Sequence, residues 1–209
     1  MSREIDLSLN SFLEVMNYDS IESACSISKN GTSYFSKNVL WPCKYHLEIL
    51  AYTHSWRNYD NIRKLAMAID HLFTFSEPER TIYSKIKNSY IAPCDAFIKR
   101  PVQQYTPICV SGDWIYKMEL FARCGVIPYS KYLSNELELL KQSIDINGIC
   151  NVNVDERYFK NWGAYSGLKI EENWRTEIRK KCDVTFRALL ILAYASKDCV
   201  YSTNPNLLN

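Results

Sequence analysis

The chain has 209 residues, of which 47% are apolar, and its 25 Lys and Arg against 23 Asp and Glu leave a formal net charge of +2. The apolar content excludes an intrinsically disordered chain. The near balance of charge excludes the strongly basic surface typical of nucleic-acid-binding proteins. Six glycines argue against glycine-rich phosphate loops. The length suits one domain, which we predict over residues 1–209.

The amino-terminal sequence shows no export signal. Residues 1–6 are charged where a signal peptide needs an apolar run, and the chain has no uncharged apolar run of about 18 residues that could span a membrane. The eight cysteines are scattered, and no two have the C-x-x-C spacing of a metal knuckle or redox motif. We therefore predict a cytoplasmic protein with reduced cysteines, no membrane or nucleic-acid partner, no metal and no cofactor.

Apolar residues at helical spacing predict amphipathic helices along the chain. Residues 1–40 hold the first helices and a lead-in. A second region runs from Ile62 to Phe73, with Asp60 as its N-cap. A third runs from Leu133 to Ile144 and is closed by the helix-stopping pair Asn147-Gly148.

Long connections separate these helices. Residues 74–112 contain four prolines, and residues 145–181 are rich in aromatic side chains. Both are too apolar to remain unpacked and solvated. We therefore expect ordered loops, which are the usual place for recognition residues. Within the first connection, residues 81–86 alternate weakly and indicate a short strand.

The apolar pattern also repeats. Residues 47–51 recur as residues 118–122 and again as residues 189–193, each time after 71 residues, and the following helix keeps the same offset. A fixed offset over consecutive helices is typical of a repeat architecture. The predicted units are repeat 1 (41–112), repeat 2 (113–183) and a truncated repeat 3 (184–209).

The predicted fold class is therefore all-α, with tandem inner and outer helices forming an arc. The inner helix, Tyr45 to Tyr52 in repeat 1, is apolar around its circumference and is expected to be buried on all sides. The third outer helix would begin near Asn204. Its inner helix would then lack a cover, which the amino-terminal helices or a second protomer could supply, so a homodimer is one hypothesis.

This arrangement resembles part of the α/α toroid of terpenoid cyclases and protein prenyltransferases. The resemblance extends over about residues 40–196, and residues 41–47 and 182–187 resemble the starts of inner helices in prokaryotic relatives with unassigned roles. It implies a partial toroid with a cavity for an apolar small molecule. The Asp-x-Asp-Asp, Gln-x-x-x-Gly-x-Trp, Asp-Asp-x-x-Asp and Asp-x-Cys motifs of these families are absent, so we predict a protein without catalysis.

Some polar residues in the predicted inner helices are candidates for a site. Cys43 and His46 are three residues apart and could face one metal ion, but no second pair completes a site, and both also suit a protein core. Glu48 and Glu119 occupy equivalent positions. They could form an acid/base pair or anchor a cation, or each could form a buried salt bridge, to Arg187 or Lys44.

Two functions remain open from the sequence. The first is a non-catalytic binding or scaffold domain whose aromatic loops contact a protein partner. The alternative is an enzyme or carrier that holds an apolar small molecule near Glu48 and Glu119. The chain could also be a fragment of a longer toroid protein.

Asp183 and Arg187 are spaced for an i, i+4 ion pair. The candidate binding residues are His46, Glu48, Trp114, Glu119, Trp162, Trp174, Asp183 and Arg187.

Overall fold

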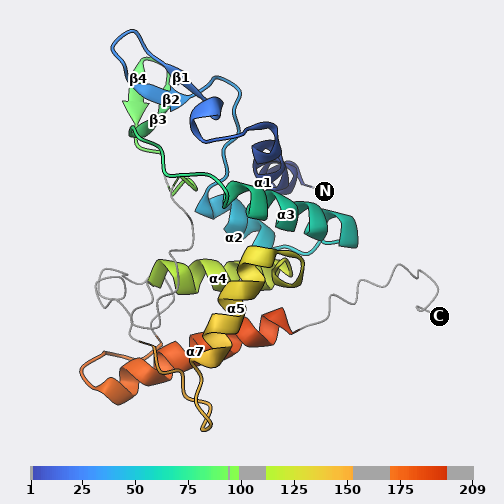
Figure 1. The fold of residues 1–209 in the computed structure, drawn as a ribbon, viewed down its shortest axis with the longest axis vertical. Coiled ribbons are helices and arrows are strands. Elements are labelled where there is room, and N and C mark those ends of the chain that lie inside the picture. The colour runs from blue at the N-terminus through green and yellow to red at the C-terminus, as the bar shows by residue number, and fades with distance from the viewer. Residues whose placement is uncertain (1, 94, 99–111, 153–169, 197–209) are drawn as a thin grey trace, which may run out of the picture.

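The computed structural model describes residues 2–93, 95–98, 112–152 and 170–196, and it combines helices with a small mixed sheet (Figure 1). The α-helices are α1 (Arg3–Glu14), α2 (Lys44–Tyr52), α3 (Tyr59–Leu72), α4 (Gly112–Cys124), α5 (Lys131–Gln142) and α7 (Glu177–Ala195). The strands are β1 (Cys25–Ile27), β2 (Ser33–Phe35), β3 (Ile82–Ile86) and β4 (Ser89–Ile91), and short 3-10 turns are η1 (Val15–Asn17), η2 (Glu22–Ala24) and η3 (Ile127–Tyr129).

The helices form where one face is apolar, but two of their predicted ends are wrong. Helix α3 buries Ile62 and Leu65 as predicted. Its N-cap is Asn58 instead of Asp60, because the extended Asn58 directs its side-chain oxygen to the backbone N–H of Asn61 at 2.9 Å. Helix α5 ends at Gln142. Gly148, with φ +78°, lies in a separate turn beyond that end.

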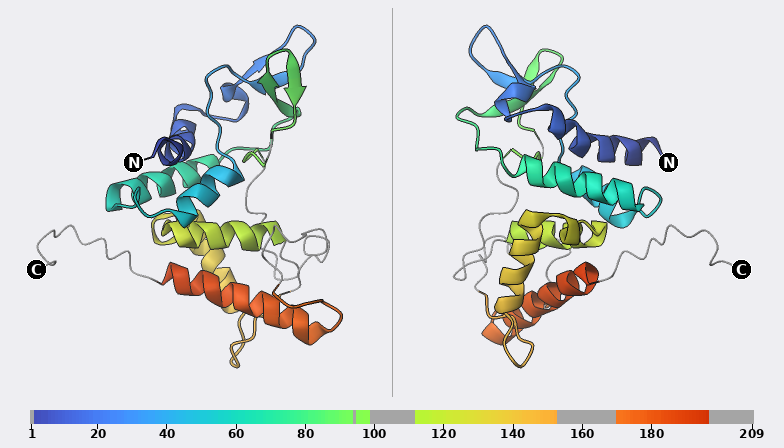
Figure 2. Two further views of the ribbon diagram at one scale, coloured as in Figure 1. Left: turned by 180° about the vertical axis from the view of Figure 1, so that it is seen from behind. Right: turned by 45° about the vertical axis from the view of Figure 1, so that its right-hand side comes forward.

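The helices pack in a row that leads away from the sheet. Helix α1 packs against α2, α2 against α4, and α4 against α7, while α3 packs on α1 and α5 crosses α7 (Figures 1 and 2). A chain of aromatic rings joins the row internally. Phe97 lies between Phe12 and Phe121, with ring centroids 5.6 and 6.5 Å away. One continuous core therefore connects α1 to α4.

The sheet lies at one end of this row, and its strand order is β1-β2-β3-β4 (Figure 1). Strand β1 is antiparallel to β2, and β3 is antiparallel to β4. The central pair, β2 and β3, is parallel, with Ser33 opposite Ile82 and Tyr34 opposite Tyr83. This pairing joins two segments that are separated by α2 and α3 in the sequence.

The all-α prediction and the α/α toroid are therefore wrong. Residues 1–40, expected to hold helices and a lead-in, contain β1 and β2, and the first long connection contains β3, as predicted, and also β4. Three of the strands have only three residues, too few for an alternating pattern to be visible. The expectation of an inner helix buried on all sides is also wrong, because Tyr45 and Tyr52 of α2 are exposed.

Among the residues that the structure describes, no helix has both the length and the apolar character needed to cross a membrane.

Candidate functional site

The polar residues predicted from the inner helices meet along the line where α2, α4 and α7 lie side by side. The Tyr116 hydroxyl of α4 donates a hydrogen bond to Glu48 of α2. Arg187 of α7 donates from Nη1 to Oε2 of Glu119 in α4, at 2.7 Å. Both pairs are 68 residues apart in the sequence. The same donor-to-acceptor contact thus occurs at two successive helix interfaces.

A second line of contacts runs beside the first. The Arg123 guanidinium of α4 lies over the ring of Tyr52 from α2, at 5.0 Å, and over the ring of Tyr194 from α7, at 4.3 Å. Arg123 also donates to the Tyr194 hydroxyl at 2.8 Å. A guanidinium between two aromatic faces is stabilised by the charge distribution of both rings. Arg123 therefore links all three helices.

Glu119 is the centre of this network. Its carboxylate is 2% exposed and accepts hydrogen bonds from Arg187 and, at 2.9 Å, from Nε of Arg123. Of the two partners considered from the sequence, Arg187 therefore contacts Glu119. A buried carboxylate held by two guanidinium groups has little capacity left for a ligand. The arrangement favours a role in holding the helices together over acid/base chemistry.

Two more of the predicted residues anchor neighbouring segments. Asp183 of α7 accepts hydrogen bonds from the backbone N–H groups of Ile170 and Glu171 and from the Trp174 indole. The Trp114 indole donates to Glu136 of α5 at 2.7 Å, and both residues are buried. Trp162 lies outside the described residues.

His46 lies in the first turn of α2, and its Nδ1 accepts a hydrogen bond from the backbone N–H of Cys43 at 3.3 Å. Cys43 and His46 thus contact each other through the start of the helix. Within the described ranges, no group of three or more His, Cys, Asp or Glu side chains is arranged to hold a metal ion.

Burial lowers the pKa of His46. The unfolded chain therefore binds a proton more readily than the folded one, and His46 contributes stability above its ordinary pKa of about 6.5 that is lost as the pH falls through the lower folded value. In an NMR titration, we expect the imidazole signals of His46 to have a lower midpoint in the folded protein than in urea. A midpoint equal to or above that of the unfolded chain would contradict this.

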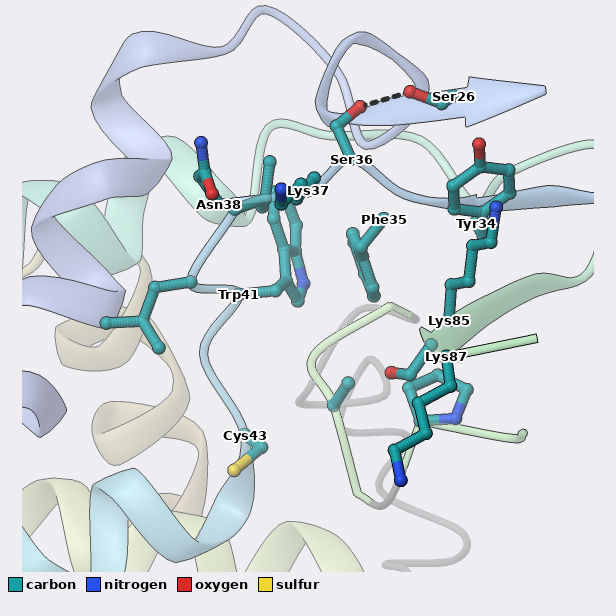
Figure 3. A pocket seen from close by; sticks show the side chains of 15 residues that line it. Ser26, Tyr34, Phe35, Ser36, Lys37, Asn38, Trp41, Cys43, Lys85 and Lys87 are labelled. Atoms are coloured by element: carbon teal, nitrogen blue, oxygen red, sulfur yellow. Dashed lines mark hydrogen bonds between the residues drawn. The ribbon is translucent and has the colours of Figure 1, made fainter. Parts of the chain in front are cut away.

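A cleft of about 860 Å³ lies apart from this network, between the sheet and the chain segment that leads into α2 (Figure 3). Strand β2 supplies Tyr34 and Phe35, and β3 and the turn after it supply Lys85 and Lys87. Trp41 and Cys43 line the cleft from the lead-in to α2 (Figure 3). The full lining is Ser26, Tyr34, Phe35, Ser36, Lys37, Asn38, Val39, Leu40, Trp41, Cys43, Ser84, Lys85, Lys87, Pro93 and Ala96.

The cleft is cationic and partly aromatic. Lys37, Lys85 and Lys87 line it, and no carboxylate occurs among its described lining residues. The Lys85 ammonium lies 4.9 Å from the centre of the Tyr34 ring and 5.8 Å from that of Tyr90. Serine hydroxyls are also present, and Ser26 and Ser36 share a hydrogen bond of 2.7 Å (Figure 3). The cleft combines positive charge, hydroxyl groups and an apolar wall.

Two lining residues have unusual backbone conformations. Asn38 has φ +94° and Lys87 has φ +54°, a region that residues other than glycine seldom adopt. Such conformations persist only where the surrounding structure holds them, and they are common at binding sites. Lys87 occupies the two-residue turn between β3 and β4, a type of turn that needs a positive φ at its first central residue or at both.

Sequence reasoning missed every lining residue of the cleft except Cys43. Lys37 and Lys85 are 48 residues apart, and only the parallel pairing of β2 with β3 brings their segments together. The one signal in the sequence was the weak alternation of residues 81–86, which predicted β3 without its partner.

Comparisons of the chain with family models, with curated proteins and with solved structures find no match. The resemblance to terpenoid cyclases and protein prenyltransferases thus has no support from the comparisons, and the mixed sheet speaks against it.

Proposed function

We propose that the protein is a non-catalytic binding domain whose cleft beside the sheet takes a small organic anion with a flat apolar part. The observation that carries the proposal is the composition of the cleft wall, with three lysines and no described carboxylate. Its volume of about 860 Å³ also suits a small-molecule ligand.

Each part of the ligand has a counterpart in the cleft. The ammonium groups of Lys85 and Lys87 and the hydroxyls of Ser36 and Ser84 suit the oxygens of a phosphate or a carboxylate. The ring of Phe35, which stacks on Trp41 at 5.1 Å and is only partly buried, supplies an apolar surface in the lining of the same cleft. Aromatic rings of this kind bind flat apolar groups well.

The enzyme or carrier alternative receives less support. It relied on Glu48 and Glu119 facing an apolar ligand, but Glu119 is buried between two arginines and Glu48 accepts the Tyr116 hydroxyl. The cleft itself is cationic, and its described lining residues include neither a carboxylate nor a histidine. This favours binding over the acid/base chemistry that histidines and carboxylates most often perform.

The test is an NMR binding experiment with phenyl phosphate and benzoate as probes, which share a phenyl ring and differ in their anionic group. Phenol and inorganic phosphate serve as half-ligands. We expect at least one aromatic anion to shift the backbone amide signals of Ser36, Ser84 and Lys85, with an affinity that weakens as salt is added. Phenyl phosphate and benzoate together distinguish a phosphate site from a carboxylate site. If neither probe shifts these signals, the proposal is wrong.

The matched variants are Lys85→Glu and Lys64→Glu. Lys85 lines the cleft, whereas Lys64 is an exposed lysine on α3 that does not line it. We expect Lys85→Glu to weaken binding roughly tenfold, about 1.4 kcal/mol, since it replaces attraction with repulsion at the anionic group. Lys64→Glu should leave the affinity within experimental error. Equal effects of the two variants would indicate a general charge effect and contradict the assignment.

A further inference from the structure

Helix α7 carries a second apolar side that faces away from the protein. Five uncharged residues at helical spacing form this side, which we call the outer stripe: Ile178, Cys182, Phe186, Leu189 and Ala193. All five are exposed. The residues that α7 buries are Asp183, Val184, Arg187, Ala188 and Ile191. At about 100° per residue, the two sets lie on opposite sides of the helix.

Equivalent positions in the neighbouring helices are covered. Leu189 is 47% exposed, whereas Leu47 of α2 and Met118 of α4, which precede it by 142 and 71 residues, are 0% exposed. Ala193 is exposed, and its counterparts Ala51 and Ala122 are buried. In α2 and α4, these positions are covered by neighbouring helices of the row. In α7, the outer stripe is covered by none of the described helices.

The row of helices has two different ends. At the sheet end, α1 packs on α2 and closes the row (Figures 1 and 2). At the other end α7 is last, and no described helix lies on its far side from α4 (Figures 1 and 2). A second copy cannot extend the row head to tail, because α1 already covers the side of α2 that it would need. Two α7 helices can instead close the assembly around a two-fold axis.

We infer that the outer stripe of α7 binds the outer stripe of a second copy of this chain, with the two helices antiparallel. A two-fold axis that crosses α7 midway between Phe186 and Leu189 brings Phe186 of each copy into contact with Leu189 of the other. The same axis sets Cys182 opposite Ala193, so that small residues face each other and the helices approach closely.

Charge selects the antiparallel direction. Arg175 and Lys181, both exposed, lie at the amino-terminal end of α7. A parallel pair would bring these cations and the two helix amino termini together, whereas an antiparallel pair separates them by much of the length of a 19-residue helix. The distance then exceeds the screening length of about 8 Å at physiological ionic strength.

The first test is sedimentation of the full chain between 1 and 100 µM (roughly the range over which a dimer with a micromolar dissociation constant separates into monomers). We expect a species of twice the 24.4 kDa chain mass, and Leu189→Glu should weaken the association roughly tenfold or more. Met67→Glu is the matched control, since Met67 is an exposed apolar residue on α3. A monomer throughout, or a dimer that Leu189→Glu leaves unchanged, overturns the inference.

The second test is a disulfide between copies, and it does not depend on how well Leu189→Glu folds. Under mild oxidation, Ala193→Cys should give a covalent dimer through Cys182 of the other copy. Within one chain the two sulfurs are about 16 Å apart along the helix and cannot bond. Cys182→Ser combined with Ala193→Cys should abolish the covalent dimer. A disulfide dimer of the unmodified chain through Cys182 would indicate parallel helices and overturn the antiparallel arrangement.

Discussion

Glu119→Gln should destabilise the protein by about 3–5 kcal/mol, the usual cost of removing one partner from a buried ion pair. The variant leaves Arg187, whose side chain is 10% exposed, with its guanidinium buried and without the carboxylate that it contacts at 2.7 Å. Arg123 loses the same carboxylate. Urea denaturation monitored by circular dichroism measures the change in the free energy of unfolding.

Glu138→Gln is the matched control for this loss of charge. Glu138 pairs with Lys141 at 2.6 Å, but both side chains are about half exposed. Exposed pairs contribute about 0.2–1 kcal/mol, so the control should change stability little. Glu119→Leu combined with Arg187→Met should recover part of the loss, because no charge is then left buried at position 187. The recovery should be incomplete, since Arg123, whose side chain is 20% exposed, still lacks the carboxylate. Equal costs for Glu119→Gln and Glu138→Gln would contradict a structural role for Glu119.

The helices were predictable because their pattern is local. The apolar residues from Ile62 to Phe73 recur at helical spacing, and this spacing alone predicts α3. The ends were less predictable, since an end depends on which polar side chain reaches a free N–H. Asn58 and Asp60 are both suitable caps by type, and only the backbone conformation of Asn58 decides between them.

The sheet was not predictable as a whole because its pairing is not local. Each of β1, β2 and β4 has three residues, and β2 meets β3 only after the chain has formed α2 and α3. Because β2 and β3 form the wall of the cleft, the candidate site could not be predicted without the sheet. The lysines that line the cleft carry no mark in the sequence that separates them from other surface lysines.

The polar network between α2, α4 and α7 was partly predictable, less than the helices and more than the sheet. The sequence showed Glu48 and Glu119 as carboxylates at equivalent positions of apolar helices, and it gave Arg187 as one of two partners. The offset that relates the helices also appears in the contacts, since Arg123 donates to Tyr194, 71 residues later. The sequence could not predict which neighbour each residue faces, because that depends on how three helices pack together. In the packed structure, Glu119 is buried in an ion pair.

Asp183→Ala should cost about 3 kcal/mol, because it removes the acceptor shared by three donors. Asp183 is buried in α7 and accepts from the N–H of Ile170 at 3.0 Å, that of Glu171 at 3.1 Å and the Trp174 indole at 2.5 Å. Bonds to a charged acceptor are stronger than neutral ones. Asp183→Asn keeps one oxygen and should have a smaller effect. Denaturation in urea measures the change for both variants.

Hydrogen exchange distinguishes this structural role from a binding role. If Asp183 holds the segment before α7, the amides of Ile170 and Glu171 should exchange faster in Asp183→Ala, while those in the middle of α4 keep their relative protection. Glu172→Ala is the control, since the side chain of Glu172 is 89% exposed. Unchanged stability and unchanged exchange at both amides would contradict the structural role. Asp183 and the outer stripe lie on opposite sides of α7. Loosening the segment before α7 should therefore leave the self-association through Leu189 intact.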